Sequence, residues 1–208
     1  MTRFVFVLPA LLLACADPVK DKPKAEVKEA APETAKNTPE GGKAETLPLD
    51  SSSTLTWVGA KVTRKHDGGF KSFTGSITLV EGDVEKSSIQ IDVDTSTIYA
   101  DEDKLTGHLK SADFFDVAKY PKATFTTTSI KKKDGSNYEV TGNLDLHGVK
   151  KSLSFPATID VSADNVSAKA EFGINRKDFQ INYPGAADDL IRDDVLIKFD
   201  IKAKRTQS

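Results

Sequence analysis

The sequence is poor in the residue types from which catalytic and metal sites are built. Its single cysteine, Cys15, rules out a disulfide within the chain. The three histidines, His66, His108 and His147, stand far apart, and none has a histidine or cysteine partner at the spacing of a metal site. No serine stands in the glycine-flanked turn that presents a nucleophile. These absences argue against an enzyme and against a resident metal or cofactor.

An excess of charge of one sign is also lacking. Lysine and arginine total 29 against 31 for aspartate and glutamate, a net charge of −2, and both signs are interspersed along the chain. A nucleic-acid partner requires a basic patch or stripe, which this sequence does not contain. The apolar run Phe4–Leu13 is shorter than the roughly 20 residues of a membrane-spanning helix.

Residues 1–15 have the features of a secretory signal peptide, with Arg3 ahead of the short apolar run. Leu12–Cys15 (LLAC) resembles the processing box of bacterial lipoproteins, in which the cysteine is lipidated and becomes the mature amino terminus. We therefore predict lipidation at Cys15 and anchoring in the cell envelope. Ala16 after the cysteine favours the outer membrane, facing the periplasm. The alternative is an ordinary cleaved signal with an incidental cysteine.

Residues 16–48 are rich in proline, lysine, glutamate and alanine and contain almost no large apolar side chains. Such a stretch buries too little apolar surface to offset the entropy of ordering it, so we predict a disordered tether. Fully extended, the tether would reach on the order of 100 Å. The remaining residues, 49–208, are enough for one folded domain with its own core.

After the tether, apolar and polar residues alternate with the period of two that is typical of half-buried strands. The eight predicted strands contain Leu55–Trp57, Phe73–Leu79, Ile89–Val93, Lys122–Ser129, Tyr138–Leu146, Leu153–Val161, Ala168–Ile174 and Val195–Ile201. Among the short links between strands, Asp67–Gly69 is interpreted as a turn, with His66 solvated or stabilising it. Eight antiparallel strands predict either a sandwich or a closed barrel.

Helix signals interrupt the strand pattern once. Acidic residues at 101–103 precede Lys110, the order that a helix dipole favours. Leu105, His108 and Leu109 fall on one face of this helix. His108 is therefore the histidine expected to look towards the interior, with helix packing as its alternative role.

Two adjacent aromatic residues, Phe114 and Phe115, follow the predicted helix. Either they seal one end of a filled core, or they form the lid of a cavity.

Long motifs of this chain resemble the YceI-like family of bacterial periplasmic lipid-binding domains. They are GHLKSADFFDVAKYPKATFTTTSIKK and YEVTGNLDLHGVKKSLSFP, with KHDGGFKSFTGSITL upstream and AEFGINRKDFQINY downstream. The resemblance implies an all-β fold, a lipocalin-like barrel of eight antiparallel strands with a short helix inserted between strands 3 and 4. It also implies a bound lipid and no covalent chemistry. Lys104 and Leu105 depart from the arginine-aspartate pair of many relatives, which leaves the accepted head group in doubt.

Several positions expected to face the barrel interior carry tiny residues, namely Gly59, Gly75, Gly142, Ala123, Ala157, Ala168 and Ala170. Alternation of large and tiny inward residues predicts an elongated apolar channel that suits a long hydrocarbon. The alternative is that the glycines mark bulges and bends, and that the alanines fit a taper.

We therefore expect a carrier of a long-chain isoprenoid lipid, of the quinone or polyprenyl type. The candidate ligand-binding residues are Trp57, Phe73, Ile91, Leu105, His108, Leu109, Phe114, Phe115, Phe125, Leu144, Phe155, Phe172, Ile174, Arg176, Phe179 and Phe199. Arg176 either meets a polar head group or pairs with Asp178 or Asp194 to pin its loop, and we favour the pairing. The competing hypothesis is an envelope structural or interaction lipoprotein with a filled barrel core. A homodimer is compatible with both hypotheses.

Overall fold

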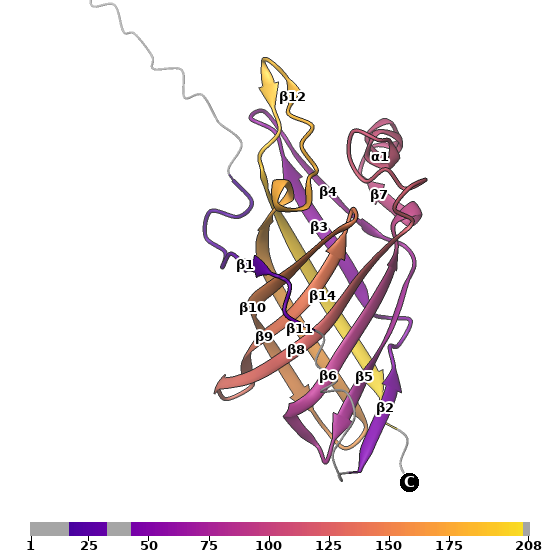
Figure 1. Cartoon of the computed structure of the whole chain (residues 1–208), viewed down its shortest axis with the longest axis vertical. Helices are drawn as coiled ribbons and strands as arrows, with labels where there is room; N and C mark the ends of the chain where they lie inside the picture. Colours follow the sequence, from indigo (N-terminus) through magenta and orange to yellow (C-terminus); the bar gives the residue numbers. More distant parts are fainter. Residues whose placement is uncertain (1–16, 33–42, 206–208) are drawn as a thin grey trace, which may run out of the picture.

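The computed structural model describes residues 17–32 and 43–205, and nearly all of its regular structure is β (Figure 1). The strands are β1 Glu26–Glu29, β2 Ala44–Pro48, β3 Thr54–Ala60, β4 Lys65–Phe70, β5 Phe73–Val80, β6 Asp83–Asp94, β7 Ile98–Ala100, β8 Lys122–Asp134, β9 Asn137–Leu146, β10 Val149–Val161, β11 Asn165–Asn175, β12 Gly185–Ala186, β13 Asp189–Leu190 and β14 Asp194–Lys204. The helices are α1 Asp103–Lys110 and two 3-10 turns, η1 Thr95–Thr97 and η2 Arg176–Phe179. The predicted signal peptide and Cys15 lie outside the described residues.

One antiparallel sheet contains every strand except the small β12–β13 hairpin. Its order is β2-β5-β6-β8-β9-β10-β11-β14-β3-β4-β7, with β1 paired to β10. The β2 end of this order returns to β14, because Leu49 after β2 bridges Ala203 in β14, and the Asp50 N–H donates to the Lys202 carbonyl oxygen at 2.6 Å. The sheet therefore curls into a barrel, which confirms the all-β prediction.

All eight predicted strands are present, as β3, β5, β6, β8, β9, β10, β11 and β14. More strands appear than predicted because each of the first three passes of the chain along the barrel is interrupted. The two parts of such a pass then pair with different neighbouring strands. For example, β2 pairs with β5, whereas β3, which continues from it, pairs with β14. When β2–β3, β4–β5 and β6–β7 are counted as three continuous paths, the barrel has eight. The helix α1 then lies between the third and fourth, as predicted.

The KHDGGF sequence is a strand, so the turn predicted at Asp67–Gly69 was wrong. In β4, Gly68 lies opposite Trp57, and a Cβ added to Gly68 would stand 2.2 Å from the indole ring. A Cβ on Gly69 would stand 2.7 Å from the Leu55 carbonyl oxygen. These glycines allow a bulky ring and a neighbouring strand to approach the backbone, and they do not mark a change of direction.

The predicted disorder of residues 16–48 was wrong for the part of this stretch that the structure describes. Residues 17–31, here called the N-terminal strap, lie along the barrel wall, and both β1 in the strap and β2 belong to the sheet. In the strap, β1 pairs with β10, and Val19 is 1% exposed in contact with Val58 and Leu196. Composition fails here because the order comes from backbone pairing and one anchoring side chain, neither of which requires an apolar segment.

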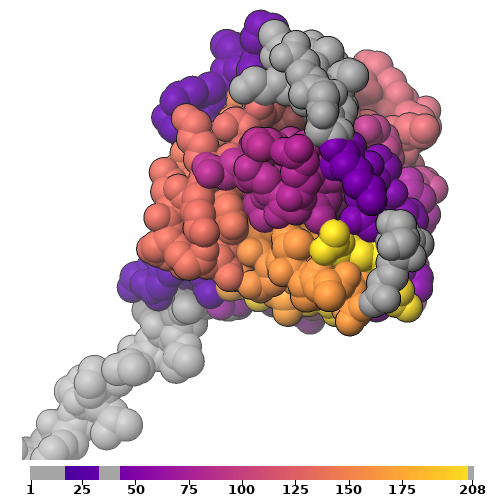
Figure 2. All heavy atoms as spheres, turned by 90° about the horizontal axis from the view of Figure 1, so that it is seen from below, coloured from indigo at the N-terminus to yellow at the C-terminus, as the bar shows by residue number. Residues whose placement is uncertain are grey.

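The interior differs between the two ends of the barrel. At the upper end of Figure 1 lie α1 and the β12–β13 hairpin. At the lower end, the β5–β6, β8–β9 and β10–β11 turns come together (Figure 2). Below the middle, side chains such as Ile77, Leu79 and Ile130 leave a void of only about 10 Å³. The elongated channel predicted from the sequence therefore does not run the length of the barrel.

Candidate functional site

An apolar cavity of about 230 Å³ occupies the upper half of the barrel. Strands β3, β4, β6, β8, β9, β10, β11 and β14 supply its wall. Its roof comes from α1 and the two phenylalanines after it, and from Ile181 and Ile191 in the segment between β11 and β14. Nearly every group that faces the cavity is a hydrocarbon, so it suits an apolar molecule and would desolvate a charged one at a high cost.

Most of the candidate binding residues line this cavity. They are Trp57, Ile91, Leu105, Leu109, Phe114, Phe115, Phe125, Leu144, Phe155, Phe172, Ile174, Arg176 and Phe199. Phe114 and Phe115 thus cover a hollow, as the lid interpretation requires. Of the small residues expected to leave space, Gly59 and Ala123 reach the cavity.

Three candidate residues do not line the cavity. Phe73 packs against the edge of the core in β5. Phe179 is fully buried in η2, and its carbonyl oxygen lies 3.2 Å from Nδ1 of His147. His108 turns away from the interior: its Nε2 lies 2.9 Å from Oδ2 of Asp113, and its side chain is 36% exposed. The prediction for His108 was wrong because the Asp113 carboxylate, five residues along the chain, holds the ring outward.

The aromatic roof is a connected cluster. The His108 ring meets Phe114 edge-on at 4.9 Å between centroids and Tyr183 at 4.8 Å. Phe114 and Tyr183 lie 5.2 Å apart. His108 therefore packs between α1 and the β11–β14 segment on the outer side of the roof, which is the packing role given as its alternative.

Trp57 forms part of the wall at β3. Its ring lies over Gly68, and it passes 3.5 Å from the place where a Cβ on Gly59 would stand. Within the described part of the chain, the buried indole N–H has no hydrogen-bond acceptor. An unsatisfied buried donor costs about 1–3 kcal/mol. Trp57 is also the one tryptophan of the chain, so its fluorescence reports on this cavity alone.

Sequence reasoning missed His66, which it treated as solvated or stabilising a turn. His66 is only 6% exposed, lines the cavity, and its Nδ1 lies 2.9 Å from Oδ1 of Asp101. Other missed lining residues are Leu55, Phe70, Val93, Leu146, Leu153, Ile181, Ile191, Val195 and Ile197. Those in predicted strands are an even number of residues from a candidate residue on the same strand, so they face inward as well. The alternation of apolar and polar residues would have found them. Ile181 and Ile191 lie in irregular chain and carried no such signal.

Arg176 plays the structural role that we favoured, although with a different partner. Its guanidinium donates to the Ile181 carbonyl oxygen at 2.6 Å, to Asp193 Oδ1 at 3.0 Å and to the Arg192 carbonyl oxygen at 3.3 Å. Burial lowers the pKa of the Arg176 guanidinium, and the Asp193 carboxylate partly offsets this. The pairing predicted with Asp178 or Asp194 was wrong because Asp193, one residue before β14, faces the guanidinium. Arg176 therefore closes the long segment between β11 and β14.

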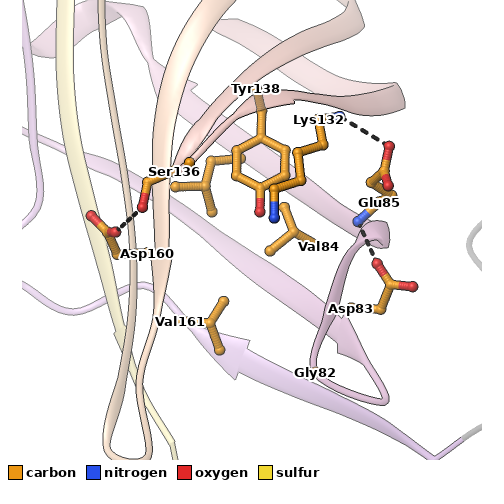
Figure 3. A pocket seen from close by; sticks show the side chains of 11 residues that line it. Gly82, Asp83, Val84, Glu85, Lys132, Ser136, Tyr138, Asp160 and Val161 are labelled. Carbon is orange, nitrogen blue, oxygen red and sulfur yellow. Dashed lines mark hydrogen bonds between the residues drawn. The ribbon is translucent and has the colours of Figure 1, made fainter.

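A second hollow, of about 430 Å³, lies at the lower end between the β5–β6 and β8–β9 turns (Figure 3). Its polar groups already satisfy one another. Ser136 Oγ donates to Asp160 Oδ1 at 2.7 Å, and the Lys132 N–H donates to Glu85 Oε1 at 2.9 Å. Its floor, which includes Val84, is shared with the packed lower core, so this hollow is separated from the upper cavity.

Two features are absent from the residues that the structure describes. In ranges 17–32 and 43–205, no helix has the length and apolar character needed to cross a membrane. Across the same ranges, no three histidine, cysteine, aspartate or glutamate side chains are grouped so that they would hold a metal ion.

An antiparallel barrel with a helix at one end and an apolar cavity beneath it has the lipocalin-like architecture of small-ligand binding proteins. Within this class, the chain belongs to the family of YceI-like domains, whose profile matches residues 48–203. The N-terminal strap lies outside that match.

Relatives by sequence include a UPF0312 protein of Pseudomonas putida (strain W619). It is 34% identical over 137 residues, which cover 63% of this chain and 71% of the relative. Protein YceI of Escherichia coli O157:H7 is 37% identical over 120 residues, covering 55% of this chain and 62% of that protein.

Solved structures share the fold. The crystal structure of Burkholderia cenocepacia BcnA superposes with a TM-score of 0.67 at 24% identity, over 74% of this chain and 99% of that one. A polyisoprenoid binding domain from Saccharophagus degradans, implicated in plant cell wall breakdown, gives 0.64 at 20% identity, over 79% and 100%.

Proposed function

We propose that this protein binds the apolar tail of an isoprenoid lipid, of the quinone or polyprenyl type, in the upper cavity and carries it without chemical change. The observation that carries the proposal is the cavity itself, whose exposed surface belongs almost entirely to aromatic and aliphatic side chains. The polyisoprenoid binding domain from Saccharophagus degradans, which shares the fold, supports the same ligand class.

The size of the cavity sets how much of the tail is enclosed. A protein cavity of about 150 Å³ accommodates the six carbons of benzene. In proportion, about 230 Å³ encloses roughly nine carbons, close to two isoprene units. Each buried methylene contributes about 0.8 kcal/mol, so these carbons supply about 7 kcal/mol before ordering costs, enough for micromolar to millimolar binding. A longer tail must extend through an opening in the wall or displace part of it.

The competing function is an envelope scaffold whose barrel is filled. The packed lower half favours that hypothesis locally, because side chains there meet across the axis. The two hypotheses make opposite predictions for the upper half, where a scaffold has no use for an empty apolar cavity that lowers stability.

A series of prenyl alcohols of increasing length tests the carrier function. Titration of the full chain with C5, C10, C15 and C20 alcohols, followed by Trp57 fluorescence, should show affinity rising steeply to C10 and weakly beyond it. Lipid extraction and mass spectrometry of the purified protein would identify the natural ligand. Recovery of a protein without lipid, together with a Trp57 emission that none of the four alcohols changes, would refute the carrier function.

We further propose that the carrier is held in the bacterial envelope through lipid on Cys15, at the outer membrane and facing the periplasm. The LLAC sequence supports this proposal. Membrane fractionation and mass spectrometry of the mature amino terminus test it, with Cys15→Ser as the control that should release the protein to the soluble fraction. Equal membrane association of the two proteins would refute lipidation at this residue.

A further inference from the structure

The barrel wall is split between β10 and β11. These strands pair only from Thr158 opposite Lys169 to Val161 opposite Val166. Both strands continue towards the upper end, β10 back to Val149 and β11 on to Asn175, without further pairing between them. Beside the cavity, in the upper half of the barrel, no hydrogen-bonded ladder therefore joins β10 directly to β11.

Pro156 explains why the ladder stops. The Ile159 N–H donates to the Ser136 carbonyl oxygen, on the β9 side of β10. Successive N–H groups of a strand point to opposite sides, so the nitrogen of Pro156 faces β11. Proline has no N–H to donate, so the ladder between β10 and β11 ends before Pro156, where an N–H directed at β11 would be needed.

The N-terminal strap occupies the split. Its strand β1 pairs with β10 from Glu26 opposite Ser154 to Glu29 opposite Lys151, and Figure 1 shows it lying along β10. On the other side, the Ala25 N–H donates to the Gly173 carbonyl oxygen, and the Gly173 N–H donates to the Pro23 carbonyl oxygen, both at 2.9 Å. The strap thus replaces the missing ladder with its own backbone.

The residues on both sides of the split line the cavity. They are Leu153 and Phe155 on β10, and Phe172 and Ile174 on β11. The Phe155 and Phe172 rings stack at 4.1 Å between centroids, at the point where the strands part. Val27 of the strap lies opposite Leu153 and packs against the same core. The strap therefore lies behind these side chains, as the outer layer of the wall on this side.

The strap is held by few buried contacts. Val19 is its one residue with almost no exposure among those described, and it fills the space above Gly173, where a Cβ would stand 2.2 Å from a Val19 methyl. Asn143 accepts from the Ala31 N–H at 3.1 Å and donates to the Ala31 carbonyl oxygen at 2.8 Å. The ion pairs of the strap, such as Lys22 with Glu171, join partly exposed side chains and contribute little.

We propose that the split between β10 and β11 is the portal through which the lipid tail enters the cavity, and that the N-terminal strap is its gate. The proposal rests on the proposed function. It assigns the gate to a segment outside the residues that match the YceI-like domain. The tail passes between Leu153 and Ile174 when the strap lifts, and the strap pairs again behind it.

A disulfide that locks the strap tests the gate. Glu26 and Ser154 are opposite residues of adjacent antiparallel strands, a separation that a disulfide spans. The protein is Glu26→Cys/Ser154→Cys in a Cys15→Ser background, so that only the two introduced thiols pair. Geraniol, with two isoprene units, is the probe, and stopped-flow Trp57 fluorescence measures its association and dissociation. The reduced form of the same protein is the control.

Locking should slow association and dissociation together by at least tenfold and leave the Kd unchanged, because a gate alters rates and not the bound state. Equal rates in the oxidised and reduced forms would overturn the portal. Binding by neither form would remove the proposed function, and the portal with it, so the two failures are distinguishable.

Gly173→Ala tests the gate in the opposite direction. The added methyl group should expel Val19 and loosen the strap, and geraniol should enter several-fold faster. Gly107→Ala is the matched control, because a Cβ at Gly107 has nothing within 4 Å. Acceleration in the Gly173 variant alone supports the gate, and unchanged rates in a folded Gly173 variant contradict it.

Discussion

Gly59 offers the sharpest test of the upper cavity, because it lines the cavity and a Cβ there would make only ordinary contacts with the Trp57 ring, at 3.5 and 3.8 Å. In Gly59→Leu, four added carbons should enter the void. Their burial is worth about 1.5–3 kcal/mol, and replacing a strand glycine adds up to about 1 kcal/mol, less some strain from packing. We expect the free energy of unfolding to rise by about 1–3 kcal/mol, and the Tm by roughly 3–10 °C.

The same variant should lose ligand. Four carbons of the tail are displaced at about 0.8 kcal/mol each, about 3 kcal/mol in total, so the affinity for geraniol should fall roughly 100-fold. Thermal unfolding and Trp57 titration measure the two effects. Gly142→Leu is the matched control: its Cβ would stand 2.4 Å from the Phe125 ring and 2.6 Å from the Thr126 carbonyl oxygen, so it should destabilise the barrel. A less stable Gly59→Leu protein that binds geraniol normally would refute the cavity as the site.

Three further predictions concern the segments that close the cavity. Asn143→Ala removes both hydrogen bonds to the end of the strap and should make the strap the first site of limited proteolysis, at a cost of about 1–2 kcal/mol in unfolding free energy. Arg176→Lys should lower unfolding free energy by about 1–3 kcal/mol in denaturant titrations, because one ammonium group cannot replace a guanidinium that meets two carbonyls and a carboxylate. Lys22 first and then Lys198 lower the pKa of Glu171, so this carboxylate stabilises the strap above its ordinary pKa of about 4.3. That contribution, which is small because both side chains are partly exposed, is lost as pH falls through the lowered value, so geraniol loading should be slightly faster in acid, and a Glu171→Gln protein should show less of this acceleration.

The barrel was predictable because its inward residues repeat with a strict period. The alternation that places Val195, Ile197 and Phe199 on one face is a local property of β14. A strand cannot shift its pairing by one residue without exposing that apolar face to solvent. The helix position was equally accessible, since charges at its two ends and Leu105 and Leu109 one turn apart are local signals.

The depth of the cavity was not predictable, because it depends on which side chains meet across the axis. Gly75 illustrates the limit: its missing side chain makes room for the backbone of β6, since a Cβ would lie 2.1 Å from the Gln90 carbonyl oxygen, and it leaves no space for ligand. Composition also misjudged the strap, which is polar yet ordered. Its order depends on Pro156, more than a hundred residues away, leaving a neighbouring strand without a partner.

If Cys15 carries lipid, as proposed, the docking of Val19 shortens the link between the barrel and the bilayer. Val19 is four residue steps from Cys15, and at about 3.3 Å a step the chain between them reaches about 13 Å, not the 100 Å scale of a free tether. With lipid on Cys15, the barrel would lie close to the lipid head groups. Lifting the strap would then lengthen this link and, in the same movement, uncover the split between β10 and β11.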